Sequence, residues 1–263
     1  MRKVSVIFCT YPSIYSDLVL ERLLNASHIQ VVAIIESTRV LKKQGYVLID
    51  SIKLLKKVGL YYAFYLFLIT TGYSILSIFS ERKKIIKNKL FSDKIDILKT
   101  KDINKLELII RKYKADYLLS AHFNQLIDKN ILDIPKYGCL NIHPGLLPVY
   151  KGVDPAFYML LRNEKKLGVT LHYQDESFDT GSIIKKIVYK RNVETSLFLV
   201  NCKLFILGIE SLLKLLRMND LLATIKTEND NTSYDSWPST YDVGNLLKQH
   251  SLINVKNLLQ TIK

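Results

Sequence analysis

Short apolar runs alternate with segments of helical spacing in the first part of the chain. Val4–Cys9 and Gln30–Glu36 are apolar, and the second is rich in β-branched residues, which is typical of strands buried in a parallel sheet. Between them, Asp17–Asn25 carries leucines at helical spacing. A strand–helix–strand order predicts a right-handed crossover and a doubly wound α/β sheet. Ligands of such sheets bind at the carboxyl ends of the strands.

Further apolar runs continue the predicted sheet. We expect strands at Asp116–Ala121, Gly138–Ile142, Gly168–Tyr173 and Ile183–Val188. Before them lies a long, mostly helical insertion at about 40–115, in which Asp93–Leu98 is a candidate strand and Lys105–Lys114 fits a helix.

The chain after the last predicted strand reads differently. Ser196–Leu216 has the spacing of an amphipathic helix, and the tail from Thr224 contains turn or hairpin material followed by a short closing helix. We therefore interpret residues 1–195 as one catalytic domain and residues 196–263 as a small helix/hairpin appendage.

Val58–Ser80 contains no charged residue and is long enough to cross a bilayer. Two observations argue against a transmembrane span. Tyrosine, threonine and serine occur in its middle, and a single crossing would separate the strands before it from those after it. We expect a helix or helix pair packed on the domain, with contact to a membrane surface left open.

Composition narrows the class of protein. The chain is 48% hydrophobic and 24% charged, as in globular proteins, and it carries 38 Lys and Arg against 24 Asp and Glu. This excess favours an anionic partner, which is nucleic acid, a membrane surface or a phosphorylated small molecule. Cys9, Cys139 and Cys202 form no metal-binding or disulfide pattern, and the N-terminus lacks a signal peptide pattern, so we expect a cytoplasmic enzyme with reduced thiols.

The segment LNIHPGLLPVYKG, Leu140–Gly152, carries the candidate chemistry. Asn141 and His143 alternate along a strand end and therefore face the same way. A fixed amide can donate to a developing oxyanion, and an imidazole can move a proton near neutral pH. Asp179, in an Asp-Thr-Gly turn after the next strand, is the best candidate for a carboxylate that orients the imidazole or holds a water.

NIHPGLLPVYKG, followed by LGVTLHYQDESFDTGSII, resembles the core signature of the formyltransferases that use 10-formyltetrahydrofolate. That family includes glycinamide ribonucleotide formyltransferase, methionyl-tRNA formyltransferase and the nucleotide-sugar N-formyltransferases. The resemblance implies a Rossmann-like formyltransferase fold, with Asn141, His143 and Asp179 as the catalytic triad. The family often has Ser at position 145 and Arg at position 151, where this chain has Gly and Lys.

The resemblance also implies a mechanism and a co-substrate site. An amine attacks the formyl carbon, Asn141 and protonated His143 stabilise the oxyanion, and His143 moves the proton directly or through a water held by Asp179. No metal is required. The folate lies between two loops and is read largely by backbone groups, which gives as candidate contacts Phe123, Asn124, Gln125, Ile127, Asp175, Glu176 and Phe178.

Among acceptors, the resemblance favours a nucleotide-linked dideoxy-amino sugar, either a dTDP-4-amino-4,6-dideoxyhexose or its 3-amino isomer, used for O-antigen or other cell-surface polysaccharide. The transfer-RNA enzymes have a C-terminal β-barrel, whereas the tail here reads as helix, turn and helix. The glycinamide ribonucleotide enzymes have a Gly-rich loop after the first strand, where this chain reads FCTYPSIYS. Candidate sugar-nucleotide contacts are Thr10, Tyr11, Lys151, Tyr234 and Trp237.

Alternatives stay open at this point. One is a formyltransferase acting on glycinamide ribonucleotide or methionyl-tRNA, and another is a non-catalytic scaffold at a membrane surface. Related enzymes are often dimers, so we expect a homodimer with the apolar insertion as its interface. His122 and His172 are expected to be structural, and Trp237 is equally well explained as an anchor of the tail.

Overall fold

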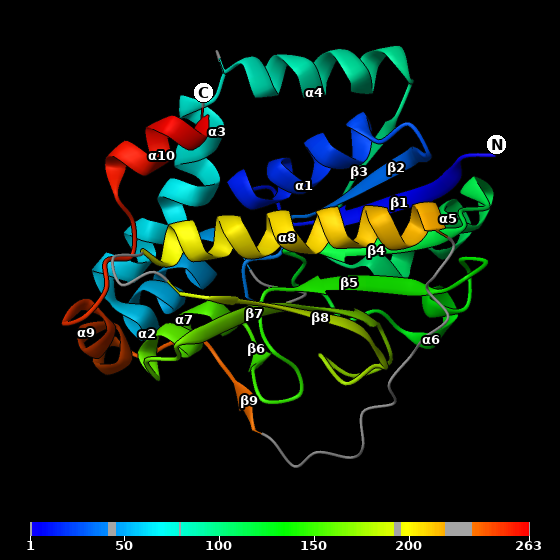
Figure 1. Cartoon of the computed structure of the whole chain (residues 1–263). Coiled ribbons are helices and arrows are strands. Elements are labelled where there is room, and N and C mark those ends of the chain that lie inside the picture. Colours follow the sequence, from blue (N-terminus) through cyan, green and yellow to red (C-terminus); the bar gives the residue numbers. More distant parts are fainter. Residues whose placement is uncertain (1, 42–45, 79, 192–195, 219–232, 263) are drawn as a thin grey trace.

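A seven-stranded sheet lies at the centre of the computed structural model, which describes residues 2–41, 46–78, 80–191, 196–218 and 233–262 (Figure 1). Its strand order is β3-β2-β1-β4-β5-β7-β8. The strands are β1 (Val4–Thr10), β2 (Ile29–Ser37), β3 (Asp96–Thr100), β4 (Tyr117–Ala121), β5 (Cys139–His143), β7 (Lys166–Tyr173) and β8 (Ile183–Lys190).

The pairing directions confirm the predicted doubly wound, mostly parallel sheet. Strands β1 to β5 are parallel to their neighbours, whereas β7 is antiparallel to β5 and β8 is antiparallel to β7. The chain leaves β1 toward β2 and β3 and returns on the other side of β1 as β4, so the strand order reverses there. A ligand crevice is expected at the carboxyl ends of strands beside such a reversal.

Helices cover both faces of the sheet because alternate strand residues point to opposite sides. Val6 and Phe8 lie in one core cluster with α1 (Ile14–Asn25) and α8 (Leu197–Met218). Ile7 and Cys9 lie in a second cluster with residues of α5 (Glu107–Tyr113) and α6 (Lys129–Leu132). The strands are therefore buried on both faces, which explains their continuous apolar sequence.

The helical insertion lies between β2 and β3 and is shorter than predicted. It comprises α2 (Val47–Phe67), a π-helical turn (Leu68–Gly72), α3 (Tyr73–Leu76) and α4 (Glu81–Ser92). The predicted range of 40–115 was too long, because β3 belongs to the central sheet, and a 3₁₀ turn (Ile103–Leu106) and α5 connect it to β4.

Tyrosines attach the apolar segment to the rest of the fold. Tyr62, Tyr65 and Tyr73 are buried. Their hydroxyl groups reach Asp154 Oδ2 at 2.6 Å, the Tyr15 hydroxyl at 2.7 Å and Asp17 Oδ2 at 2.6 Å, respectively. These bonds explain the polar residues in an otherwise apolar run.

One helical stretch, Val47–Leu76, is long and apolar enough to cross a membrane by length and composition. However, β2 before it and β3 after it are parallel neighbours in one sheet. A single crossing would place those two strands on opposite sides of the membrane. The segment is therefore packed on the domain, as the sequence predicted.

The chain after residue 195 is joined to the core more closely than an appendage. Helix α8 packs on β5 and β7, so the predicted boundary at 195 falls within one continuous core. The described tail forms β9 (Tyr234–Asp235), α9 (Thr240–Leu247) and α10 (Val255–Ile262). Instead of a hairpin on itself, β9 pairs in parallel with β6 (Lys151–Gly152), and the predicted turn residues before 233 lie outside the described residues.

Close packing of α8 on the sheet generates a prediction. A Cβ atom at Gly208 would lie 2.4 Å from Ile142 Cγ2 and 3.1 Å from Val169 Cγ2, and both neighbours are β-branched and stiff. Gly208→Ala should therefore lower the free energy of unfolding in urea by about 1–3 kcal/mol. The control is Gly244→Ala in α9, where nothing lies within 4 Å and alanine should stabilise by up to about 1 kcal/mol. A Gly208→Ala protein as stable as Gly244→Ala would contradict this packing.

Candidate active site

Three adjacent strands align polar side chains in one row across the sheet. The register pairs Ser120 of β4 with Asn141 of β5, and Asn141 with His172 of β7. Ser120 Oγ donates to Asn141 Oδ1 at 2.8 Å, and Asn141 Nδ2 lies 3.0 Å from His172 Nε2. The amide of Asn141 is therefore held from both sides by neighbouring strands.

The protonation state of His172 determines which atom donates in the hydrogen bond between Asn141 and His172. His172 Nδ1 lies 2.7 Å from the Tyr173 carbonyl oxygen, which only accepts, so Nδ1 carries the proton. Burial and the charge of His143 lower the pKa of His172 to about 4, so its ring is neutral at physiological pH. Nε2 then accepts one N–H of Asn141. The second N–H of that amide has no acceptor in the hydrogen bonds of the described residues.

His143, two residues along β5, is buried and faces an acceptor at each ring nitrogen. Nδ1 lies 3.1 Å from Asp179 Oδ1, and Nε2 lies 2.6 Å from the Tyr150 carbonyl oxygen. Burial alone lowers the pKa of His143, but the Asp179 carboxylate and the Tyr150 carbonyl raise it more, so the net shift is upward. The imidazolium form satisfies both acceptors.

Asp179 lies between β7 and β8 and completes the arrangement. Its backbone is left-handed, with φ of 59°. Its Oδ2 atom accepts the Gly152 N–H at 3.0 Å. Burial raises the pKa of Asp179, but the His143 charge and these hydrogen bonds lower it below its usual value. The predicted Asn141, His143 and Asp179 are thus brought together, with the last two as an ion pair.

The loop after His143 is shaped by Gly145 and Thr170. A Cβ at position 145 would lie 2.4 Å from Pro155 Cβ and 3.0 Å from both His143 Nε2 and the Tyr150 oxygen. Thr170, opposite His143 on β7, donates to the Gly145 carbonyl at 2.6 Å and accepts the Leu147 N–H at 3.0 Å. Glycine at 145 therefore allows the imidazole to reach the Tyr150 carbonyl.

A small cavity of about 40 Å³ lies beside this cluster. It is lined by Asn141, His172 and Asp179 together with five of the predicted folate contacts, which are Phe123, Gln125, Ile127, Asp175 and Phe178. Asn124 and Glu176 are not among its lining residues. The two predicted loops thus meet next to the triad.

Two of the predicted folate side chains also have structural roles. Gln125 accepts the Ile103 N–H at 2.7 Å and donates to Ser37 Oγ at 2.8 Å, so its amide holds the loop to the neighbouring strands. Ile127 is buried in the second core cluster. Only the backbone of these two residues remains for a ligand, and the folate roles of all seven residues stay predictions.

Sequence analysis assigned no site role to Ser120, Thr170, His172 or Gln174. His172 was expected to be structural, although it binds the Asn141 amide. Gln174 lines the cavity, and its Oε1 atom is buried without a hydrogen-bond partner in the described part of the chain. The strand alternation that relates Thr170 to His172 was a signal for the histidine, but using it requires the pairing of β5 with β7.

The predicted sugar-nucleotide contacts divide into two groups. Lys151 lies in β6 beside Gly152, and Tyr234 lies in the paired strand β9 with its ring 6.1 Å from that of Phe178. Both are therefore close to Asp179. Thr10 is buried and donates to the Ala121 carbonyl at 2.8 Å, which ties β1 to β4.

Tyr11 and Trp237 lie elsewhere. Tyr11 is half-buried at the end of β1, beside His122. Trp237 is half-buried against the core, so it anchors the tail. The substrate roles of all five residues stay predictions.

Donor atoms of His143, His172 and Asp179 lie within 4.8 Å of one another, a spacing that a metal ion could use. Each ring nitrogen of the two histidines already has a hydrogen-bond partner within the protein. The arrangement as it stands therefore suits proton transfer and charge stabilisation, and a metal would have to replace these bonds.

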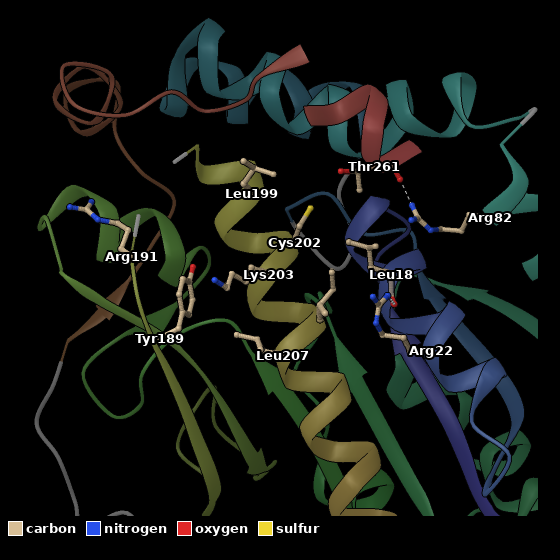
Figure 2. A pocket seen from close by; sticks show the side chains of 11 residues that line it. Leu18, Arg22, Arg82, Tyr189, Arg191, Leu199, Cys202, Lys203, Leu207 and Thr261 are labelled. Carbon is tan, nitrogen blue, oxygen red and sulfur yellow. Dashed lines mark hydrogen bonds between the residues drawn. The ribbon is translucent and has the colours of Figure 1, made fainter. Parts of the chain in front are cut away.

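A larger cavity, of about 620 Å³, lies away from this site and shares none of its residues. Figure 2 shows its lining side chains on both sides of α8, with Lys203 beside Tyr189. Arg82 pairs with Glu21 at 2.9 Å, and Arg22 lies 3.4 Å from Glu210. The other two cations lining the cavity have neutral partners: Arg191 bonds Asn163 and His250, and Lys203 lies over the Tyr189 ring.

Comparison with known proteins shows similarity to formyltransferases. Residues 69–194 match the family model described as formyl transferase, and this range includes the complete triad. The methionyl-tRNA formyltransferase of Alkaliphilus oremlandii is 27% identical over 209 residues, which is 73% of this chain and 67% of that protein. That of Halothermothrix orenii is 32% identical over 64% of this chain and 54% of its own length. The chain is similar to formyltransferases and spans about half to two thirds of the length of these two relatives.

Solved structures share the fold at low sequence identity. A 4-N formyltransferase from Francisella tularensis matches 89% of this chain and 76% of its own, with a TM-score of 0.55 and 20% identity. An N-formyltransferase from Helicobacter canadensis, in complex with folinic acid and dTDP-3-aminofucose, matches 98% of this chain and 82% of its own, with a TM-score of 0.54 and 17% identity. A glycinamide ribonucleotide transformylase from Symbiobacterium toebii matches 83% of this chain and 88% of its own, with a TM-score of 0.56 and 14% identity. The predicted formyltransferase fold is confirmed.

The His143–Asp179 ion pair predicts that removing the Asp179 charge changes the pKa of His143. Asp179→Asn removes the charge that raises the pKa of His143, so this pKa should fall. NMR titration of the His143 ring measures it. The control is Asp175→Asn in the same loop, whose carboxylate bonds Ser177 and Thr180 instead. An unchanged His143 pKa in Asp179→Asn would contradict the pairing.

The free energy of unfolding should depend on pH through the His143–Asp179 ion pair. The folded pKa of His143 is raised, so its contribution is fully present below about pH 6.5, its unfolded value, and is lost as pH rises through the folded pKa. The folded pKa of Asp179 is lowered, so its contribution is present above about pH 4 and is lost in acid. The difference in unfolding free energy between the wild type and Asp179→Asn should therefore be largest between about pH 4 and 6.5.

Proposed function

We propose that this protein is an N-formyltransferase that moves a formyl group from 10-formyltetrahydrofolate to the amino group of a nucleotide-linked dideoxy-amino sugar. The observation that carries the proposal is the buried His143–Asp179 ion pair beside an amide that retains one N–H for a ligand. The unpaired and buried cysteines, Cys9, Cys139 and Cys202, agree with a cytoplasmic enzyme.

The side chains divide the chemistry among them. The folate supplies the formyl group, whose oxygen becomes negative as the acceptor amine adds to its carbon. The second N–H of Asn141 and the charge of His143 stabilise that oxygen. The bond from the formyl carbon to the folate nitrogen then breaks, the acceptor amine loses a proton and the leaving folate nitrogen gains one. His143 would pass this proton once its Nε2–H leaves the Tyr150 carbonyl, and Asp179 keeps the ring charged and oriented. The raised pKa of His143 keeps more of it protonated near neutral pH.

The residues around the small cavity fit a pterin ring. Gln174 Oε1 is a buried acceptor without a partner in the described residues, and the amino and ring N–H groups of a pterin are donors. The cavity of about 40 Å³ is smaller than a pterin, so binding requires the loop at Asp175–Phe178 to move outward. Glu176 and Phe178 at its tip are exposed.

Two observations support a sugar nucleotide as the acceptor. The Helicobacter canadensis enzyme with dTDP-3-aminofucose matches 98% of this chain, so the likeness includes the tail. That tail brings Tyr234 beside Phe178 and pairs β9 with β6, which places an aromatic ring near the triad. Such a product would serve O-antigen or other surface polysaccharide synthesis.

A second candidate acceptor is methionyl-tRNA. The curated relatives named above act, by their names, on this substrate, and the chain has a formal charge of +14. Nucleic-acid binding by cations is strongly salt-dependent, so this alternative predicts a steep loss of affinity with salt. The same experiment tests both candidates.

The test is formylation of a panel with 10-formyltetrahydrofolate as donor, scored by the mass gain of one formyl group. The panel contains dTDP-linked 3-amino and 4-amino sugars, methionyl-tRNA and glycinamide ribonucleotide. We expect turnover only of an amino sugar. Asn141→Ala, His143→Ala and Asp179→Ala should each lower kcat by about 10²–10³-fold, whereas Asn130→Ala, an exposed amide, should not. Transfer to methionyl-tRNA alone would overturn the acceptor, and full activity of His143→Ala would overturn the mechanism.

His172 is a positioning residue in this scheme. His172→Phe removes the acceptor that orients the Asn141 amide, so kcat should fall about tenfold with KM nearly unchanged. His172→Gln keeps an acceptor and should retain more activity. Because the pKa of His172 is about 4, neither variant should shift the pH profile between pH 6 and 8. Equal losses in both variants would point to a packing role.

A further inference from the structure

The outer side of α2 carries an exposed band of large apolar residues. This band, here called the apolar stripe, consists of Leu48, Ile52, Leu60, Tyr61, Phe64 and Phe67. Leu60 and Tyr61 are each 73% exposed, and Phe64 is 55% exposed. The Phe64 and Phe67 rings stack on one another at 6.3 Å, on the solvent side. Leu48 and Ile52 lie before the break at Gly59 and the other four residues after it, and exposed apolar side chains grouped in this way mark an interaction site.

The helix is apolar on two opposite sides. After a break at Gly59, where φ is 77° and the backbone is not helical, Tyr62, Tyr65 and Ile69 recur at intervals of three and four residues and are buried against the fold. Leu60, Phe64 and Phe67 follow the same spacing on the other side. Only 33% of the apolar window is buried, so packing on the domain accounts for one side of the helix alone.

Positive charge accompanies the stripe. Between residues 46 and 92 there are eight Lys and Arg residues against two acidic ones, although on α4 three of these cations, Arg82, Lys83 and Lys84, pair with Glu21, Asp17 and Glu81. Lys53 and Lys56 are exposed on α2 itself. A second copy of the chain would bring these like charges together across a shared interface, whereas an anionic lipid surface attracts them. Charge therefore favours a bilayer over self-association.

We propose that the apolar stripe docks this protein on the surface of a membrane that contains anionic lipid. Helix α2 lies in the plane of the interface, with the stripe inserted among the acyl chain ends and the lysines at the headgroups. Figure 1 shows α2 and α3 at the end of the molecule opposite the N-terminus, with α9 packed beside α2. The binding is peripheral, because β2 and β3 hold both ends of the insertion at one sheet.

Vesicle co-sedimentation of the full chain tests the proposal. The vesicles are phosphatidylcholine with or without phosphatidylglycerol. Wild-type protein should bind the anionic vesicles, and raising the salt from about 0.1 M to about 0.5 M should weaken that binding. Leu60→Ser/Phe64→Ser should lower the partition coefficient at least tenfold, and Lys53→Glu/Lys56→Glu should lower it on anionic vesicles in particular.

The matched control is Leu108→Ser/Val188→Ser, which removes two exposed apolar side chains on α5 and β8. It should bind vesicles like the wild type. Circular dichroism confirms that each variant is folded. Absence of wild-type binding to anionic vesicles, or equal binding by the stripe variant, overturns the proposal. So does a wild-type dimer in sedimentation equilibrium that the stripe variant loses, since the occupant would then be a second copy.

Discussion

The ion pair between His143 and Asp179 is the interaction on which the site depends. Burial opposes charge on both groups, and the opposite charge 3.1 Å away is the main interaction that offsets it, supported by the Tyr150 carbonyl and the Gly152 N–H. The pair needs three segments to converge: the end of β5, the backbone at Tyr150–Gly152 and the turn after β7. Gly145 and Thr170 serve that convergence by letting the intervening loop fold back over the imidazole.

The sheet contributes orientation as well as support. Because β7 runs antiparallel to β5, residue 172 lies directly opposite residue 141, and its neutral ring accepts a single amide proton. The neutral state of His172 follows partly from the charged state of His143. The charge of His143 therefore contributes to the chemistry of His143 itself and, through the neutral ring of His172, to the orientation of the Asn141 amide.

Some site residues can be predicted from a local sequence motif, whereas others can be predicted only when the pairing of the strands is known. Asn141, His143 and Asp179 lie in local motifs at strand ends. The buried strands can be predicted because they are apolar runs in the sequence. His172 and Gln174 depend on which strands pair and on their register, which a single sequence does not contain. The same limit explains Thr10 and Gln125, since their partners are far along the chain. The insertion was drawn too long because the sequence indicates a strand at Asp93–Leu98 but not that this strand pairs with β2 in the central sheet.

The apolar residues of α2 include some that pack on the fold and others that face solvent, and the sequence pattern alone does not distinguish the two groups. Its tyrosine hydroxyls bond buried groups of the fold, which holds one side of α2 inward at fixed positions. The residues between them point outward and gain nothing from the fold, so a purely stabilising role would leave them polar. Large apolar side chains kept in water lower solubility and increase aggregation. A partner that removes them from water explains the composition of the outer side, and the surrounding lysines select an anionic one.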